Sequence, residues 1–253
     1  MKTFKTIEEI IEKLDEIISW SIDHKSTLGY FACTYRSTTI AVLKGVQNNK
    51  FEDGPRMIAL DIAFANRYFD ALENYQNNKK CTNAWFTAFE STKNEKLLIL
   101  QHILLGMNAH INLDLGVSAA SVMPYGKIAP LRKDFNTIND TIASINQNVQ
   151  DSLSKICYSV EYIDKIAKDK DNIILDFAIS KARETAWATA YIVSNSINFI
   201  RPSLINMVDN AATLIAKNII ISNNTPAKLL QKLKDCESND VVKNIETLAY
   251  TKN

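Results

Sequence analysis

The chain has 253 residues, of which 46% are hydrophobic and 23% charged, an ordinary balance for a globular protein with a sizeable core. Because 29 Lys and Arg offset 28 Asp and Glu, the net charge of +1 provides no field of one sign that would collect nucleic acid. Six glycines and five prolines are too few for the turns of an all-β protein, so we expect an all-α fold.

The N-terminal segment and the cysteines indicate the cellular setting. Residues 1–20 carry acidic side chains throughout and lack the apolar run of a signal peptide. We also expect no membrane span, since no uninterrupted apolar run approaches roughly 20 residues. The four cysteines are far apart and form no CxxC pair, which is typical of reduced, mostly buried thiols. Together these features predict a cytoplasmic protein.

Hydrophobic periodicity and capping residues predict a succession of helices. Thr6 and Glu9 fit a capping box that starts the first helix. Asp53 and Pro55 mark a turn and the start of the third. Asp134 is placed to cap a long helix after a loop that contains two prolines and a glycine. The expected helices cover about residues 7–24, 30–48, 55–76, 95–122, 134–169 and 172–200, followed by a short C-terminal pair.

The sequence shows no sign of a boundary between domains. The sequence contains no internal repeat, low-complexity segment or shift in composition that would mark a boundary. We expect a single-domain helical bundle around a buried central helix at about residues 95–122. Residues 1–200 form its core, and residues 201–253 form C-terminal helices that pack on the same domain.

The predicted central helix carries polar side chains on two faces. His110 and Asp114, at i, i+4 spacing, point the same way and could offer two ligands to one metal ion. Asn108 and Asn112 form a second pair on roughly the opposite face. His102 lies about 12 Å from His110 along the helix axis, which suits a group that orients a ligand or moves a proton. Such a helix is expected to be surrounded by others.

Other helices contribute further candidates. Asp61 belongs to a core-facing stripe of the helix at 55–76, whereas Arg56 and Arg67 lie on its far side, in ion pairs or in solvent. Gly106 costs about 1 kcal/mol of helix propensity, which indicates that another helix or a ligand approaches closely there. The helix at 172–200 has a narrow polar and aromatic stripe. Its members are Asp176, Ser180, Arg183, Trp187 and Ser194.

Several segments resemble a family of bacterial proteins catalogued only as a domain of unknown function. They are FEDGPRMIALDIAFANRYFDAL, LQHILLGMNAHINLDLG, LRKDFNTIN and ARETAW, within roughly residues 28–195. The most specific element is H-x(3)-G-M-N-A-H-I-N-x-D-L. The resemblance implies an all-helical soluble domain and no activity, and it leaves the last 55 or so residues outside. The positions it marks as signature residues are Asp61, His102, Asn108, His110, Asn112 and Asp114.

Three functions remain open from the sequence. In the first, a metal-assisted hydrolase or lyase acts on a small polar or phosphorylated substrate, with Zn, Mn or Fe held by His110, Asp114 and Asp61. His102 then orients a metal ligand or moves a proton. Arg183 holds the anionic group of the substrate, or its charge is neutralised by Asp176.

The second function is a helical module without catalysis, which binds a small apolar or amphipathic molecule. Its pocket would be lined by Phe64, Tyr68 and Trp187, while Asn108 and Asn112, with Asp176 as a further ligand-binding group, would satisfy polar atoms. The third is a structural or interaction protein in which the buried polar network only fixes how the helices pack. Whether the protein is an enzyme stays open.

Overall fold

The computed structural model describes residues 3–157, 179–222 and 226–249. Over these ranges the fold is all-α, as predicted, with no strand and one isolated bridge between Cys157 and Glu237. The α-helices are α1 (Ile7–Asp23), α2 (Leu28–Gln47), α3 (Gly54–Gln76), α4 (Asn83–Ser91), α5 (Ile99–Asn108), α6 (Gly116–Val122), α7 (Arg132–Ile156), α9 (Ile179–Asn195), α10 (Arg201–Ile221), α11 (Ala227–Cys236) and α12 (Val241–Ala249).

Most of the predicted helices are found close to their expected bounds. The capping box of α1 is present, because Thr6 Oγ1 accepts from the backbone N–H of Glu9 at 3.2 Å and the Glu9 carboxylate accepts from that of Thr6 at 3.3 Å. Asp53 caps α3 by accepting from the backbone of Arg56 at 2.9 Å. Parts of the helices predicted at 134–169 and 172–200, together with Asp176, lie outside the described residues.

Asp134 has a different role from the predicted one. α7 begins at Arg132, and the buried Asp134 carboxylate accepts from the backbone N–H groups of Glu52 and Asp53 at 2.7 and 3.1 Å. It also pairs with the guanidinium of Arg56 at 2.6 Å. The prediction that Asp134 caps its own helix is therefore wrong, because Asp134 lies inside α7 and its carboxylate binds the backbone of the turn before α3 instead.

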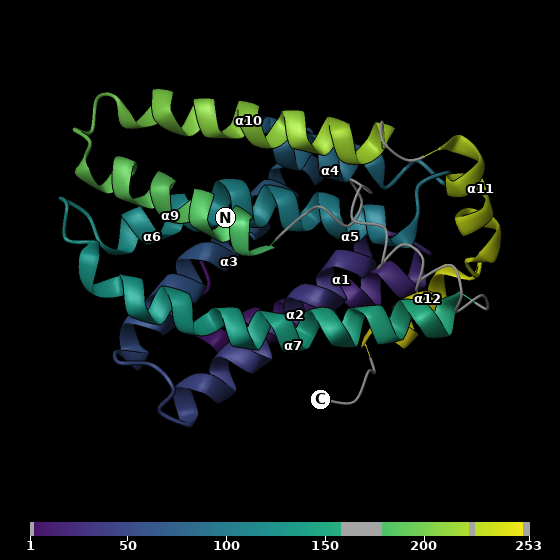
Figure 1. Ribbon diagram of the computed structural model, residues 1–253, viewed down its shortest axis with the longest axis horizontal. Helices are drawn as coiled ribbons and strands as arrows, with labels where there is room; N and C mark the ends of the chain where they lie inside the picture. The colour runs from purple at the N-terminus through teal and green to yellow at the C-terminus, as the bar shows by residue number, and fades with distance from the viewer. Residues whose placement is uncertain (1–2, 158–178, 223–225, 250–253) are drawn as a thin grey trace.

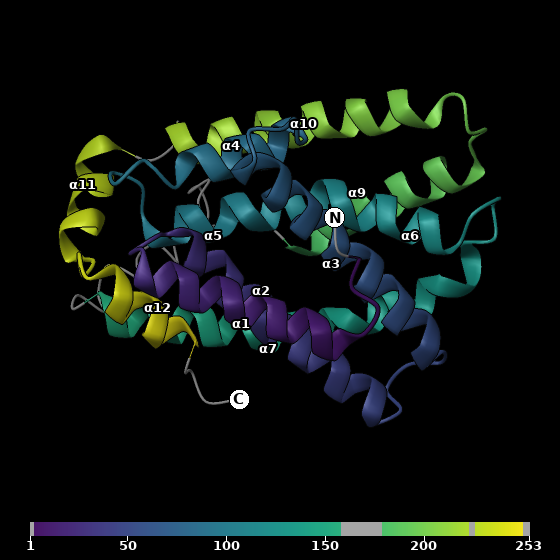
Figure 2. The same ribbon diagram turned by 180° about the vertical axis from the view of Figure 1, so that it is seen from behind.

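α5, a π-helical turn at Ala109–Leu115 and α6 form one continuous rod through the middle of the molecule (Figures 1 and 2). α10 runs along one long side of this rod, and α7 runs along the opposite side. α2, α3, α4, α9 and α10 all contact the π-helical turn or its flanking helices. The rod is the predicted central helix, although it begins at Ile99 rather than near residue 95.

Two glycines of the rod allow neighbouring helices to approach. A Cβ at Gly106 would overlap the ring of Phe31 in α2, which confirms the close approach predicted at this position. A Cβ at Gly116 would lie 2.6 Å from the carbonyl oxygen of Ala186 in α9.

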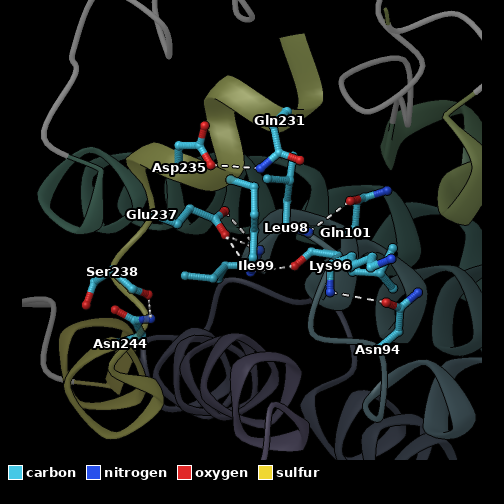
Figure 3. Close-up of polar contacts among 12 residues, drawn as sticks. Asn94, Lys96, Leu98, Ile99, Gln101, Gln231, Asp235, Glu237, Ser238 and Asn244 are labelled. Atoms are coloured by element: carbon cyan, nitrogen blue, oxygen red, sulfur yellow. Dashed lines mark hydrogen bonds and ion pairs between the residues drawn. The ribbon is translucent and has the colours of Figure 1, made fainter. Parts of the chain in front are cut away.

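The N-terminus of the rod is held by the C-terminal part of the chain (Figure 3). The Glu237 carboxylate accepts from the backbone N–H of Ile99 at 2.9 Å, and Lys234 donates to the carbonyl of Leu97 at 2.9 Å. The Gln101 amide donates to the carbonyl of Ile219 at 2.7 Å. The Glu237 contact satisfies a backbone N–H that a helix start leaves unpaired, and the Gln101 contact satisfies a carbonyl at the C-terminal end of α10.

Cys157 and Cys236 form a disulfide with their Cα atoms 5.0 Å apart, which joins the end of α7 to the end of α11. Cys33 and Cys81 are free thiols. The prediction of four reduced cysteines is wrong for the bonded pair, because a sequence separation of 79 residues gives no local sign that the fold brings them together. The cytoplasmic location stays a prediction.

The hydrophobic core consists of two clusters. The first packs around Tyr68, Trp85 and Leu105, and the second around Met57 and Phe135. Phe64 and Met107 are partly buried and contact both clusters. The boundary between the clusters therefore runs beside the π-helical turn, where the polar residues of the rod are found.

Candidate functional site

The π-helical turn places His110 and Asp114 close together, as their spacing predicts. The Nδ1 atom of His110 lies 3.8 Å from Oδ2 of Asp114, and both side chains are buried. π-helical turns inside α-helices are rare and frequently occur at functional sites. This turn interrupts the α-helical hydrogen bonding over the same seven residues that carry the imidazole and the carboxylate.

Asp114 is held by two donors from other helices. Its Oδ1 accepts from Nε of Arg67 in α3 at 2.8 Å, and its Oδ2 accepts from Nε1 of Trp85 in α4 at 2.6 Å. Burial alone would raise the pKa of Asp114, but the charge of Arg67 and the contacts of His110 and Trp85 outweigh it and lower the pKa. Asp114 is therefore an ionised carboxylate at neutral pH.

His110 lies in an aromatic cage. Its ring stacks on Phe64 with centroids 3.4 Å apart, and it packs at an interplanar angle of 68° against Tyr35 with centroids 4.3 Å apart. Burial lowers the pKa of His110, with Asp114 opposing the shift, so the imidazole is neutral at pH 7. A carboxylate beside Nδ1 favours the tautomer with the proton on Nδ1, which leaves Nε2 as an acceptor.

A cavity of about 70 Å³ lies against the free side of His110, between α2, α3, the rod, α7 and α9. Apart from its polar groups, the walls are mainly aromatic and aliphatic. They include Phe31, Val42, Met57, Leu60, Phe64, Met107, Ile111, Leu115 and Ile138. The cavity therefore sits at the boundary between the two core clusters.

Polar atoms with no partner face this cavity. Among the described residues, Asp61 Oδ2, Tyr35 Oη and Nε2 of His110 are buried and neither accept nor donate a hydrogen bond, whereas Nδ1 of His110 lies 3.8 Å from the Asp114 carboxylate. Burial raises the pKa of Asp61 to about 7, and burial followed by the nearby charge of Asp61 raises the pKa of Tyr35 well above its usual value. Buried polar groups are normally paired, so this convergence points to a missing partner.

The predicted site residues divide between this cavity and other places. His110, Asp61 and Arg183 line the cavity, and burial lowers the pKa of the Arg183 guanidinium to about 10. Arg183 also donates to the carbonyl of Phe135 and lies 4.4 Å over its ring. Asp114 does not line the cavity and acts on it through His110.

Four predicted residues lie away from the cavity. Asn108 donates to the carbonyl of Ala212 in α10 at 2.8 Å, and Asn112 donates to Asn108 at 3.0 Å, so this pair ties the rod to α10. His102 packs near Tyr30 and borders a separate void of about 20 Å³, and burial lowers its pKa to about 4. Trp187 packs on Phe135. Of the stripe at 172–200, Asp176 lies outside the described residues.

The predicted metal ligands are not arranged around one point. Both oxygens of Asp114 are engaged by Arg67 and Trp85, whereas Asp61 and His110 face the cavity. In the part of the chain that the structure describes, no three His, Cys, Asp or Glu side chains are grouped so that they could hold an ion. A metal-assisted activity stays a prediction without support from this geometry.

Two residues of the site were missed. The sequence leaves Arg67 on the far side of its helix, in an ion pair or in solvent, and the structure shows the ion pair, with Asp114 as the partner. Tyr35 is one of several aromatic residues in α2 with no distinguishing pattern. The one available signal for Arg67 was the cost of burying the unpaired carboxylate of Asp114, which requires a cation from another helix.

A family model described as a family of unknown function, DUF5995, matches residues 7–222. The chain belongs to this family. The DUF5995 match confirms the predicted resemblance and extends beyond residues 28–195 to include α10, which the sequence analysis left outside. Neither the curated proteins nor the solved structures contain a match. The function of DUF5995 is unknown, so membership assigns no activity to the chain.

Proposed function

We propose that the protein binds a small amphipathic molecule in the cavity beside His110, without a metal ion. The observation that supports this most directly is the set of unpartnered polar atoms of Asp61, Tyr35 and His110 on otherwise apolar walls. Such a combination of apolar lining and a few convergent polar groups is typical of small-molecule sites.

The protonation states of the site residues indicate which polar group the ligand carries. Because Asp114 is ionised, the neutral His110 offers Nε2 as an acceptor. Asp61, with a pKa of about 7, is also an acceptor above neutral pH. A molecule that donates a hydrogen bond to one or both of these groups therefore fits best. A primary amine with an apolar body can donate to both, and an alcohol can donate its single O–H to one of them while its oxygen accepts from the Tyr35 hydroxyl.

The cavity limits the size of the ligand. A water molecule needs roughly 10–15 Å³ on the same measure, so a cavity of about 70 Å³ accommodates roughly five non-hydrogen atoms. Butylamine and isobutanol have this size. The hydroxyl groups of Thr34 and Thr38, which also line the cavity, donate to backbone carbonyls of their own helix at 3.3 and 3.0 Å. They are not paired with a base as nucleophiles are, which favours binding over covalent catalysis.

The test is a thermal-shift titration of the full chain with butylamine, isobutanol and butyrate at pH 8. Butylamine and isobutanol should raise the melting temperature in a concentration-dependent manner, whereas butyrate should not. His110→Gln should abolish the shift. His102→Gln, which changes a buried histidine outside the cavity, should retain it.

A shift by butyrate alone would contradict the proposed ligand class. Equal shifts in the two histidine variants would show that the cavity is not the site. Metal analysis of protein purified without chelator provides an independent check, since a stoichiometric divalent ion would favour the metal-assisted function instead.

A further inference from the structure

Exposed apolar side chains gather on one part of the surface. Of the twelve large hydrophobic residues exposed among the described residues, nine lie in the end of α9, the following turn and α10. Tyr125 adjoins them, because its ring lies 5.9 Å from the guanidinium of Arg201. We call these ten residues the α10 surface: Tyr125, Tyr191, Ile192, Ile197, Phe199, Ile200, Met207, Leu214, Ile215 and Ile221.

α10 is apolar on two opposite sides. The inward side, with Ala212 and Ala216, is buried against the rest of the fold. The outward side carries Met207, Leu214 and Ile221 at seven-residue spacing, and each is at least 60% exposed. A helix side that is rich in apolar residues is normally covered, so a helix with two such sides is expected to be covered on both. By length and composition α10 could cross a membrane, yet only 22% of its most apolar stretch is buried.

The inward contacts of α10 tie it to the body of the protein. The Asp209 carboxylate accepts from the backbone N–H groups of Asn83 and Ala84 at the start of α4, both at 2.8 Å. Ala212 accepts from Asn108 of the rod. Figures 1 and 2 both show α10 lying lengthwise along the molecule. A helix fixed in this way offers only its outward side, so it can lie on a membrane but not cross one.

The charged side chains that reach solvent within the segment carrying the α10 surface are positive. Between Tyr191 and Ile221 the one acid is Asp209, and it is 4% exposed; the exposed Glu184 precedes this segment, and Asp70 of α3 lines a pocket beside the start of α10. The cations of the same region are Arg201 and Lys217, and Lys127 is exposed beside Tyr125. Apolar and aromatic side chains bordered by cations are typical of helices that lie in the plane of a membrane interface. The positive border also complements anionic lipid headgroups.

We propose that the α10 surface docks on a membrane interface that contains anionic lipid. Phe199, which is 88% exposed in the turn before α10, and Ile197, which is 68% exposed, enter the acyl region. Arg201 and Lys217 lie at the level of the lipid phosphates. The α10 surface carries this inference by itself, and it does not depend on a ligand in the His110 cavity.

The experiment is co-sedimentation of the full chain with vesicles of equal parts phosphatidylglycerol and phosphatidylcholine, and with vesicles of phosphatidylcholine alone. The chain should bind the anionic vesicles at least tenfold more tightly, and binding should weaken as salt is raised. The double variant Ile197→Ser, Phe199→Ser should bind at least tenfold more weakly. Trp20→Ser, which removes an exposed aromatic residue from α1, should bind like the wild type.

Circular dichroism of each variant confirms that the fold is retained. Absence of binding to anionic vesicles would overturn the proposal, as would an equal loss of binding in Trp20→Ser. A dimer detected by sedimentation equilibrium that dissociates in the double variant, together with no vesicle binding, would assign the surface to a second copy of the chain and would also overturn it.

Discussion

Asp61→Asn isolates the most perturbed carboxyl group of the site. The substitution keeps the shape of the side chain and removes its ability to ionise. In the folded protein the pKa of Asp61 is raised from 3.8 to about 7 by burial, so folding binds a proton at intermediate pH. The contribution of this group to stability is therefore most favourable below pH 4, falls as the pH rises to about 7 and is constant above.

The expected magnitude follows from the size of the shift. One pKa unit corresponds to about 1.4 kcal/mol, so ionisation of Asp61 disfavours the folded state by about 1.5 kcal/mol at pH 5 and about 4 kcal/mol at pH 8. The asparagine carries no such penalty. The difference in the free energy of unfolding between Asp61→Asn and the wild type should therefore shift by about 2.5 kcal/mol in favour of the variant from pH 5 to pH 8.

Urea unfolding at the two pH values measures this difference. Comparison with the wild type at each pH cancels the contributions of Glu237, whose pKa burial also raises to about 7, and of His102. Asp23→Asn, which alters an exposed aspartate, should give the same small effect at both pH values. If the effect of Asp61→Asn is also independent of pH, the carboxyl group ionises normally and the cavity is not a dry environment.

Two further predictions concern the packing around the site. Gly106→Ala should lower the free energy of unfolding by about 1–3 kcal/mol, measured by urea unfolding, because the new Cβ overlaps the ring of Phe31. The better helix propensity of alanine offsets only part of this loss. A stabilised variant would show that α2 can move away. Arg67→Met should lower the free energy of unfolding by about 3 kcal/mol at pH 7, because it leaves the buried Asp114 carboxylate without its cation. The loss should be smaller at pH 4, where Asp114 can be protonated in the variant. A loss that does not change with pH would contradict the lowered pKa of Asp114.

Local patterns in the sequence predicted what local physics determines. The capping box at Thr6 and the turn at Asp53 fix helix starts within a few residues, so their bounds were accurate. The spacing of His110 and Asp114 likewise placed the two side chains together. Gly106 indicated a close neighbour, because glycine lowers helix stability and is therefore expected inside a helix only where a side chain would not fit.

Contacts between distant segments could not be predicted in the same way. Which cation would neutralise Asp114 depended on how α3 crosses the rod, and several arginines were available. The asparagines at 108 and 112 have the same polarity whether they bind a ligand or a neighbouring helix, and the contact with α10 decided between these interpretations. The pairing of Cys157 with Cys236 and the widened turn around His110 leave no periodic signal, since both arise from tertiary packing.

The position of the cavity between two hydrophobic clusters has a consequence for dynamics. Among the described residues, Phe64 and Met107 are the partly buried hydrophobic side chains that pack against both clusters. A guest that fills the gap would join the halves into one cooperative unit. Amide hydrogens of α4, which packs in the first cluster, and of α9, which packs in the second, would then exchange at more similar and slower rates when a ligand is bound.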